Sequence, residues 1–127
     1  MQKIADQFKS ERRLRWIENS AALSTVKKYS VGTVAAGSSA AVVTQSFLGW
    51  KAHQGLYVSY YLKNSASAAV SITVNGSTLL LDHAAGSASA AVCPEIKKGV
   101  NTLTVTVTAE GGSISSGEIL TKIVDLG

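Results

Sequence analysis

The chain of 127 residues has almost no cysteine and little charge. Cys93 is its single cysteine, so no disulfide can form within the chain, and a small secreted scaffold held by disulfides is excluded. Only 16% of the residues are charged, yet no apolar run approaches the ~18 residues that a transmembrane helix needs. Charges at Lys3, Asp6 and Lys9 interrupt the first residues. We therefore expect no signal peptide, synthesis in a host cytoplasm and no membrane insertion.

Residues that could carry catalysis or bind a metal are also sparse. His53 and His83 are the only histidines, and the sequence has neither a Cys-x-x-Cys nor a His-x-x-x-His pair, so no metal site is predicted. Asp82 stands next to His83, but the Gly-x-Ser-x-Gly motif of a serine nucleophile is absent. Cys93 is predicted to be a small packed residue and not a nucleophile. The sequence thus predicts a protein that is not an enzyme and needs no cofactor.

The net charge of +4 belongs to the N-terminal segment. Residues 1–28 hold seven Lys or Arg and three Asp or Glu, whereas residues 29–127 hold five of each. A basic tail is typical of proteins that bind nucleic acid. Here Glu11 and Glu18 flank the basic residues 12–15, which favours a solvated or partner-docking helix. Nucleic acid is therefore not an expected partner.

Residues 2–23 contain good helix formers and neither glycine nor proline, which predicts an α-helix. Its apolar residues do not follow one heptad seam, so we expect two short helical segments or a helix that touches different partners along its length. Trp16 is the expected anchor, although it can instead pack on the chain's own β-domain. The predicted partner-docking residues are Phe8, Leu14, Trp16 and Ile17. We divide the chain into a docking or oligomerisation segment, 1–28, and a β-sandwich head, 29–127.

The strongest periodicity in the chain lies in residues 100–109. Leu103, Val105 and Val107 alternate with threonines, which predicts a strand with one aliphatic face and one uncharged polar face. Asn75-Gly76 predicts a type I′ hairpin, and residues 94–99 are expected to form a loop. Similar patterns predict strands at 29–34, 40–47, 56–62, 68–74, 78–83, 88–93 and 119–126. Short strands at this spacing are typical of a mainly β, antiparallel sandwich or barrel.

The order of these motifs resembles one family of jelly rolls. Gly55-Leu56-Tyr57-Val58-Ser59-Tyr60-Tyr61 is followed by Val74-Asn75-Gly76, Ile96-Lys97-Lys98-Gly99, the strand 103–107 and a final strand at 119–126. Over about residues 55–126 this order resembles the tumour necrosis factor-like and complement globular heads, of the kind found in trimeric bacteriophage fibre and baseplate proteins. The resemblance implies an antiparallel jelly-roll-like β-sandwich behind a short N-terminal α-helix.

The resemblance also implies a function. It suggests a homotrimeric attachment or surface-binding head of a phage or prophage virion, linked to other virion proteins through its N-terminal helix. A host cell-surface saccharide is a candidate ligand. Two alternatives remain open, a monomeric carbohydrate-binding or adhesin module and a capsid head-decoration protein.

Aromatic residues supply the candidate ligand site. Trp50 and His53 precede Gly55, and Tyr57 and Tyr61 lie on the strand that follows, where rings can stack on a sugar. The alternative is that Trp50 and Tyr60 fill the sandwich. The predicted ligand-binding residues are Trp50, His53, Tyr57 and Tyr61.

Overall fold

The computed structural model describes residues 26–126, which form nine β-strands and no helix. No helix in this range is therefore long and apolar enough to cross a membrane. The predicted helix at 2–23, with Phe8, Leu14, Trp16 and Ile17, lies outside the described residues. The strands are β1 (Lys27–Val31), β2 (Ser39–Gly49), β3 (Gln54–Asn64), β4 (Ala68–Val74), β5 (Ser77–His83), β6 (Gly86–Val92), β7 (Glu95–Ile96), β8 (Gly99–Ala109) and β9 (Ile114–Asp125).

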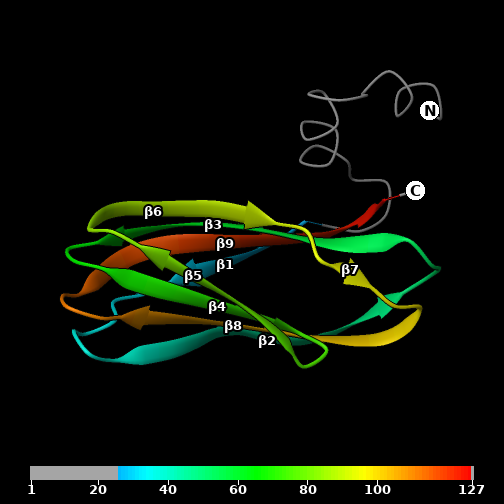
Figure 1. Ribbon diagram of the computed structural model, residues 1–127, viewed down its shortest axis with the longest axis horizontal. Coiled ribbons are helices and arrows are strands. Elements are labelled where there is room, and N and C mark those ends of the chain that lie inside the picture. The colour runs from blue at the N-terminus through cyan, green and yellow to red at the C-terminus, as the bar shows by residue number, and fades with distance from the viewer. Residues whose placement is uncertain (1–25, 127) are drawn as a thin grey trace, which may run out of the picture.

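The strands form two antiparallel sheets that pack face to face (Figure 1). One sheet has the order β1-β9-β3-β6, with β7 also paired to β3, and the other has the order β2-β8-β4-β5. The pairings are nested along the chain, since β1 pairs with β9, β2 with β8, β3 with β6 and β7, and β4 with β5. A long antiparallel ribbon folded over in this way is a jelly roll. The predicted jelly-roll-like sandwich is confirmed.

The alternation in β8 has the predicted consequence. Leu103, Val105 and Val107 are buried between the sheets, where they pack with the inward residues of β3, β4 and β9. The threonines of β8 lie on the opposite face. There the Oγ1 of Thr108 lies 2.8 Å from the Oγ of Ser39, a hydroxyl–hydroxyl hydrogen bond between neighbouring strands. Burial of the aliphatic face supplies most of the stabilisation, because such cross-strand pairs contribute only ~0.2–1 kcal/mol each.

The Asn75-Gly76 turn joins β4 to β5. Asn75 has φ of 52° and Gly76 has φ of 85°, the pair of positive values that a type I′ turn requires. Val74 and Ser77 face each other across it. The predicted hairpin is confirmed.

Several strand boundaries differ from the prediction, among them those of the last and the first strand. The last strand begins at Ile114 and includes Gly117, whereas the sequence predicts a strand that starts only at Ile119. A Cβ on Gly117 would lie 2.5 Å from the carbonyl oxygen of Tyr61, so this glycine permits a close approach of β9 to β3 and does not end the strand. The first strand begins at Lys27, inside the segment that was assigned to the N-terminal domain.

The expected loop at 94–99 also contains structure. Glu95 and Ile96 form the short strand β7, which pairs with Gly55 and Gln54 at the start of β3. Asn101 is fully buried beside it, and its Nδ2 donates to the carbonyl oxygens of Lys97 and Gly99 at 2.9 and 3.0 Å. This side chain therefore holds the connection between β7 and β8.

Candidate functional site

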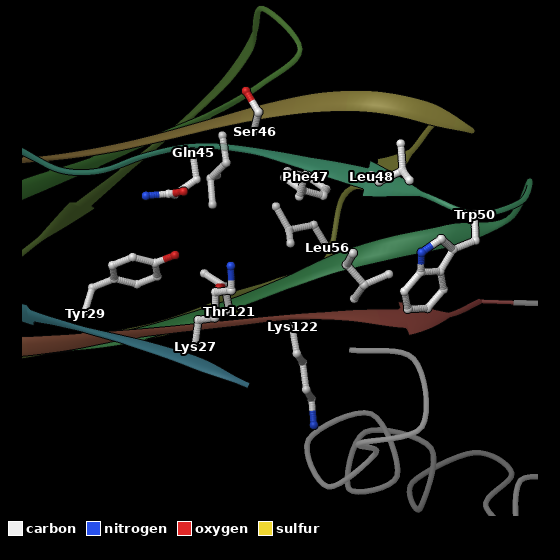
Figure 2. A pocket seen from close by; sticks show the side chains of 12 residues that line it. Lys27, Tyr29, Gln45, Ser46, Phe47, Leu48, Trp50, Leu56, Thr121 and Lys122 are labelled. Carbon is white, nitrogen blue, oxygen red and sulfur yellow. The ribbon is translucent and has the colours of Figure 1, made fainter. Parts of the chain in front are cut away.

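A groove opens between the two sheets along the side where β1 and β2 form the edges. It encloses about 530 Å³, within the ~300–1,000 Å³ range of small-molecule sites. In Figure 2, Lys27 and Tyr29 point into this space from β1, while Gln45 and Phe47 face it from β2. Trp50 stands at one end. The remaining lining residues are Ser46, Leu48, Leu56, Leu103, Thr121, Lys122 and Ile123.

A bulge in β2 sets which of its side chains enter the groove. The register with β8 shifts between Ala41 and Val43. Beyond the shift Gln45 lies opposite Leu103, and both residues line the groove. A bulge adds one residue to a strand, so without it the other side chains of this segment would face inward. The bulge therefore places Gln45 and Phe47 in the groove.

The opposite wall comes from β1 and β9. Tyr29 pairs with Ile119 and Lys27 pairs with Thr121, so alternate residues of both strands face the interior. Ile119 is completely buried, whereas Tyr29 is only partly covered. The wall therefore changes from packed core to accessible surface toward the edge strand β1.

Trp50 sits on a loop that is held in place by Gln54. The Oε1 of Gln54 accepts hydrogen bonds from the backbone N–H groups of Trp50, at 2.7 Å, and of Lys51, at 3.2 Å. The Nζ of Lys51 lies 2.7 Å from the Oδ2 of Asp125, which ties the loop to β9. Trp50 itself remains 48% exposed. A half-exposed aromatic ring on an anchored backbone is already ordered for contact with a ligand.

The loop returns to β3 through a left-handed residue. His53 has φ of 63°, and its carbonyl oxygen accepts a hydrogen bond from the N–H of Leu126 at 2.8 Å. Together with Gln54 this contact closes the loop at both ends.

The chemistry of the groove is apolar with a few neutral polar groups. Phe47, Leu56 and Leu103 supply apolar surface, and Gln45 and Thr121 supply hydrogen-bonding groups. The described residues that line it include no carboxylate, and Lys27 is the one whose ammonium group points inward. Lys122 points away from the groove, with its Nζ 5.6 Å from the centre of the Tyr57 ring on the far side of the sheet. Such a lining suits a neutral ligand that has both apolar and hydroxyl surface.

The structure separates the four residues that were predicted to bind ligand. Trp50 lines the groove, but His53 lies outside it, with Nδ1 3.6 Å from the Oε2 of Glu95. Tyr57 and Tyr61 lie on the outer face of β3, where Tyr57 is buried and Tyr61 is 50% exposed. The four side chains therefore do not form one platform. The reason is the two-residue period of β3, which directs odd-numbered residues away from the interior.

Sequence reasoning did not identify Tyr29, Gln45, Phe47 and Thr121 as neighbours. The alternation within each strand predicts which face of that strand a side chain occupies. It does not predict that β1 and β2, which belong to different sheets, lie next to each other. Only the order of the strands shows that these two edges flank the same opening.

The other candidate residues have structural partners. The Nε2 of His83 lies 2.5 Å from the Oη of Tyr60, and the two rings meet edge to face at 5.6 Å. Burial raises the pKa of Tyr60 to about 12. Cys93 packs in a small cluster with Tyr57 and Val124 on the outer face of β3 and β9. Among residues 26–126, no three His, Cys, Asp or Glu side chains lie together as metal ligands would.

No protein-family model matches the sequence, and no curated protein matches it. Several solved structures are similar to it at low identity. A family 35 carbohydrate binding module from an environmental isolate is 21% identical with a TM-score of 0.47, and the match covers 72% of each chain. An exo-β-1,3-galactanase from Phanerochaete chrysosporium, with galactose, is 16% identical with a TM-score of 0.40 over 80% of this chain and 30% of that one. A third structure, of the infectious bursal disease virus Gx strain, is 12% identical with a TM-score of 0.37 over 81% of this chain and 29% of that one.

Proposed function

We propose that this chain is a non-catalytic carbohydrate-binding module and that the groove between β1 and β2 is its binding site. The observation that carries the proposal is Trp50, which is half exposed at the end of the groove on a loop that Gln54 anchors. The groove is fit for recognition because it combines aromatic rings with neutral hydrogen-bonding groups. Without a carboxylate among its described lining residues, it has no general acid or base of the kind that glycoside hydrolysis uses.

A sugar ring suits this lining on physical grounds. One face of a pyranose presents C–H groups, which pack on an indole, while its hydroxyl groups donate and accept hydrogen bonds at the edge. Trp50 and Phe47 supply the stacking surfaces, and Gln45 and Thr121 supply neutral partners for hydroxyls. Because the loop that carries Trp50 is held by Gln54, little ordering is left to occur on binding.

The experiment is a binding screen of the full chain against an array of neutral oligosaccharides, followed by titration calorimetry with the best ligand. We expect Trp50→Ala to weaken binding by at least about 10-fold, because a central aromatic contact is lost. Tyr61→Ala is the matched control. Tyr61 is about as exposed as Trp50, but it lies on the outer face of β3, away from the groove. Equal affinities of the Trp50→Ala variant and the parent would refute the groove as the site, and a failure to bind any neutral oligosaccharide would refute the proposed function.

The second candidate is the trimeric attachment head of a phage or prophage virion. The observation that favours it is apolar surface on an outer strand, where Leu79 and Leu80 of β5 are 45% and 64% exposed. Monomeric proteins rarely expose adjacent large apolar side chains on a sheet edge, whereas assembled heads cover them. In this reading the predicted docking residues Phe8, Leu14, Trp16 and Ile17 would contact other virion proteins. Light scattering tests it, since a trimeric head requires a mass of three chains.

A further inference from the structure

Strand β5 forms an edge of the sandwich that no other described strand covers. It pairs with β4 on one side and has no strand partner on the other within residues 26–126. Four consecutive residues, Ser77 to Leu80, are exposed. An edge strand presents unpaired N–H and C=O groups, and a second strand can add to it.

β5 lacks the features that usually prevent such pairing. Its only carboxylate is Asp82, it contains no proline or lysine, and its register with β4 runs from Ser77 to His83 without a shift. The edge strand β2, by contrast, carries a bulge, and the edge strand β1 begins with two lysines. Charge, proline and bulges are the common means by which proteins protect sheet edges. Of these three edges, β5 alone is unprotected. The fourth edge strand, β6, also has no charge, proline or register shift, but apart from Val92 it consists of small residues.

The hairpin predicts which backbone groups of β5 face outward. In a type I′ hairpin the residues that flank the turn, here Val74 and Ser77, form a hydrogen-bonded pair, and such pairs recur at every second residue. Ser77, Leu79 and Leu81 therefore direct their backbone groups toward β4. The N–H and C=O groups of Thr78, Leu80 and Asp82 point away from it and are available to another strand.

We propose that two copies of this chain associate through β5, antiparallel and around a two-fold axis at Leu80. In this register Leu80 meets Leu80 of the second copy, and Leu79 meets Leu81, so apolar side chains face one another on both sides of the ribbon. Thr78 meets Asp82, so the strand's one carboxylate faces a hydroxyl and not a second carboxylate. The self-complementary order of residues around Leu80 is the reason to assign the edge to a second copy.

Other registers are less favourable. A shift that centres the axis on Leu81 places Leu80 against Asp82, and one that centres it on Leu79 leaves Asp82 without a partner residue on the strand. A pairing that differs by one residue, with Leu80 opposite Leu81, would place side chains of the outer face of one copy beside those of the inner face of the other. The Leu80-centred register alone keeps apolar residues together and the carboxylate opposite a hydrogen-bond donor.

The association has a structural consequence for the groove. It joins the two four-stranded sheets into one, with the order β2-β8-β4-β5-β5-β4-β8-β2. The grooves beside β2 then lie at opposite ends of this sheet, roughly 34 Å apart, and both stay open. Where the grooves bind a surface with repeated ligands, two sites on one rigid body raise the avidity. The pairing itself does not depend on what the grooves bind.

The test is the solution mass of the full chain by light scattering after size-exclusion chromatography. A pair of seven-residue edges is only about 24 Å long, so we expect dissociation in the micromolar range, and the mass is measured from about 1 to 500 µM. We expect the mass to rise from one chain to two with concentration. Leu80→Lys should raise the dissociation constant at least about 10-fold, because two ammonium groups would meet at the axis.

Val100→Lys is the matched control, because Val100 is 62% exposed but lies on β8, away from β5. Circular dichroism confirms that both variants remain folded. A single-chain mass at every concentration, a mass of three chains, or a dimer that Leu80→Lys leaves intact would each overturn the proposal.

A crosslink provides a second measurement that does not depend on affinity. In a Cys93→Ser background, Leu80→Cys places two thiols across the axis in a hydrogen-bonded pair, where the Cα atoms of facing residues lie ~5.5 Å apart, within disulfide range. Mild oxidation should convert this variant to a covalent dimer, while Val100→Cys in the same background should remain a single chain. Equal crosslinking of the two variants would overturn the assignment of the axis.

Discussion

Replacement of Gln54 by methionine tests whether one buried side chain holds the mouth of the groove. Gln54 is completely buried, and its Oε1 accepts hydrogen bonds from the backbone of Trp50 and Lys51. Methionine has a similar unbranched shape and volume but no strong acceptor. The substitution therefore removes two hydrogen bonds and leaves the packing at the start of β3 nearly unchanged.

The expected change in stability follows from two opposing terms. Loss of two neutral hydrogen bonds costs about 1–3 kcal/mol in total. The Nε2 of Gln54 is buried and has no acceptor within hydrogen-bonding distance among the described residues, so its removal relieves about 1 kcal/mol of desolvation cost. The two terms leave a net loss between about 0 and 2 kcal/mol, so we expect Gln54→Met to lower the free energy of unfolding by about 1 kcal/mol.

The substitution should also weaken ligand binding. Once the backbone of Trp50 is released, the ring must be ordered again when the ligand binds, which costs about 0.5–1.5 kcal/mol. That cost corresponds to roughly 2- to 12-fold lower affinity. A substitution that destabilises the fold away from this loop would lower the free energy of unfolding without lowering the affinity of the folded protein for the ligand.

Urea unfolding followed by circular dichroism measures the first effect. With a slope of about 1–3 kcal/mol/M, a loss of about 1 kcal/mol should lower the midpoint by roughly 0.3–1 M. Lys51→Ala is the control on the same loop, because its ion pair with Asp125 is solvent-exposed and should contribute less than about 1 kcal/mol. An unchanged midpoint in Gln54→Met, or an equal loss in the two variants, would refute the idea that Gln54 anchors the loop.

Two further predictions concern β3 and its neighbours. Gly117→Ala should destabilise the fold by about 1–3 kcal/mol, since a Cβ there would lie 2.5 Å from the carbonyl oxygen of Tyr61. Gly32→Ala is the control, because a Cβ at Gly32 would have no other atom within 4 Å. Thermal unfolding of both variants measures the difference, and equal stabilities would contradict the prediction. Because burial raises the pKa of Tyr60 to about 12, the unfolded chain ionises this group first, near pH 10, and the stability that it contributes is lost as the pH rises from about 10 to 12. Tyr60→Phe should therefore lose less stability than the parent over that range in urea titrations at several pH values, and parallel losses would show that Tyr60 is not responsible.

The strands themselves were predictable from local patterns. Val105 and Val107 alternate with threonines in β8, and in the structure the valines are buried while the threonines between them are only half-buried. Asn75-Gly76 predicted the hairpin between β4 and β5 because few residue pairs tolerate two positive φ angles. Both features depend on residues within a few positions of each other, so the chain reveals them without any knowledge of the fold.

Gly117 shows where local reasoning fails. A glycine between two runs of other residues usually indicates a turn, and the last strand was therefore expected to begin after it. In the structure Gly117 lies inside β9, opposite Leu62 of β3, and a side chain would collide with that strand. The requirement comes from a segment more than fifty residues away, so no local pattern could distinguish it from a turn.

The candidate site divides in the same way. Trp50 could be chosen from the sequence because it is a large aromatic residue in a polar loop. Tyr57 and Tyr61 were predicted as ligand contacts because they are aromatic residues on the strand that follows this loop, but the pleat of β3 directs them to the outer face. Tyr29 and Phe47 were not chosen, although they line the groove with Trp50.

By itself, then, the amino-acid sequence determined that this chain forms antiparallel strands, where its best hairpin lies and which faces of its strands are apolar. Those properties follow from side-chain period and from the backbone freedom of single residues. Only the tertiary structure decided which edges lie together, because strand order is set by contacts between distant segments. The nested pairing of the jelly roll brings β1 and β2 to one side and leaves β5 at the other. The groove and the exposed edge are both consequences of that order.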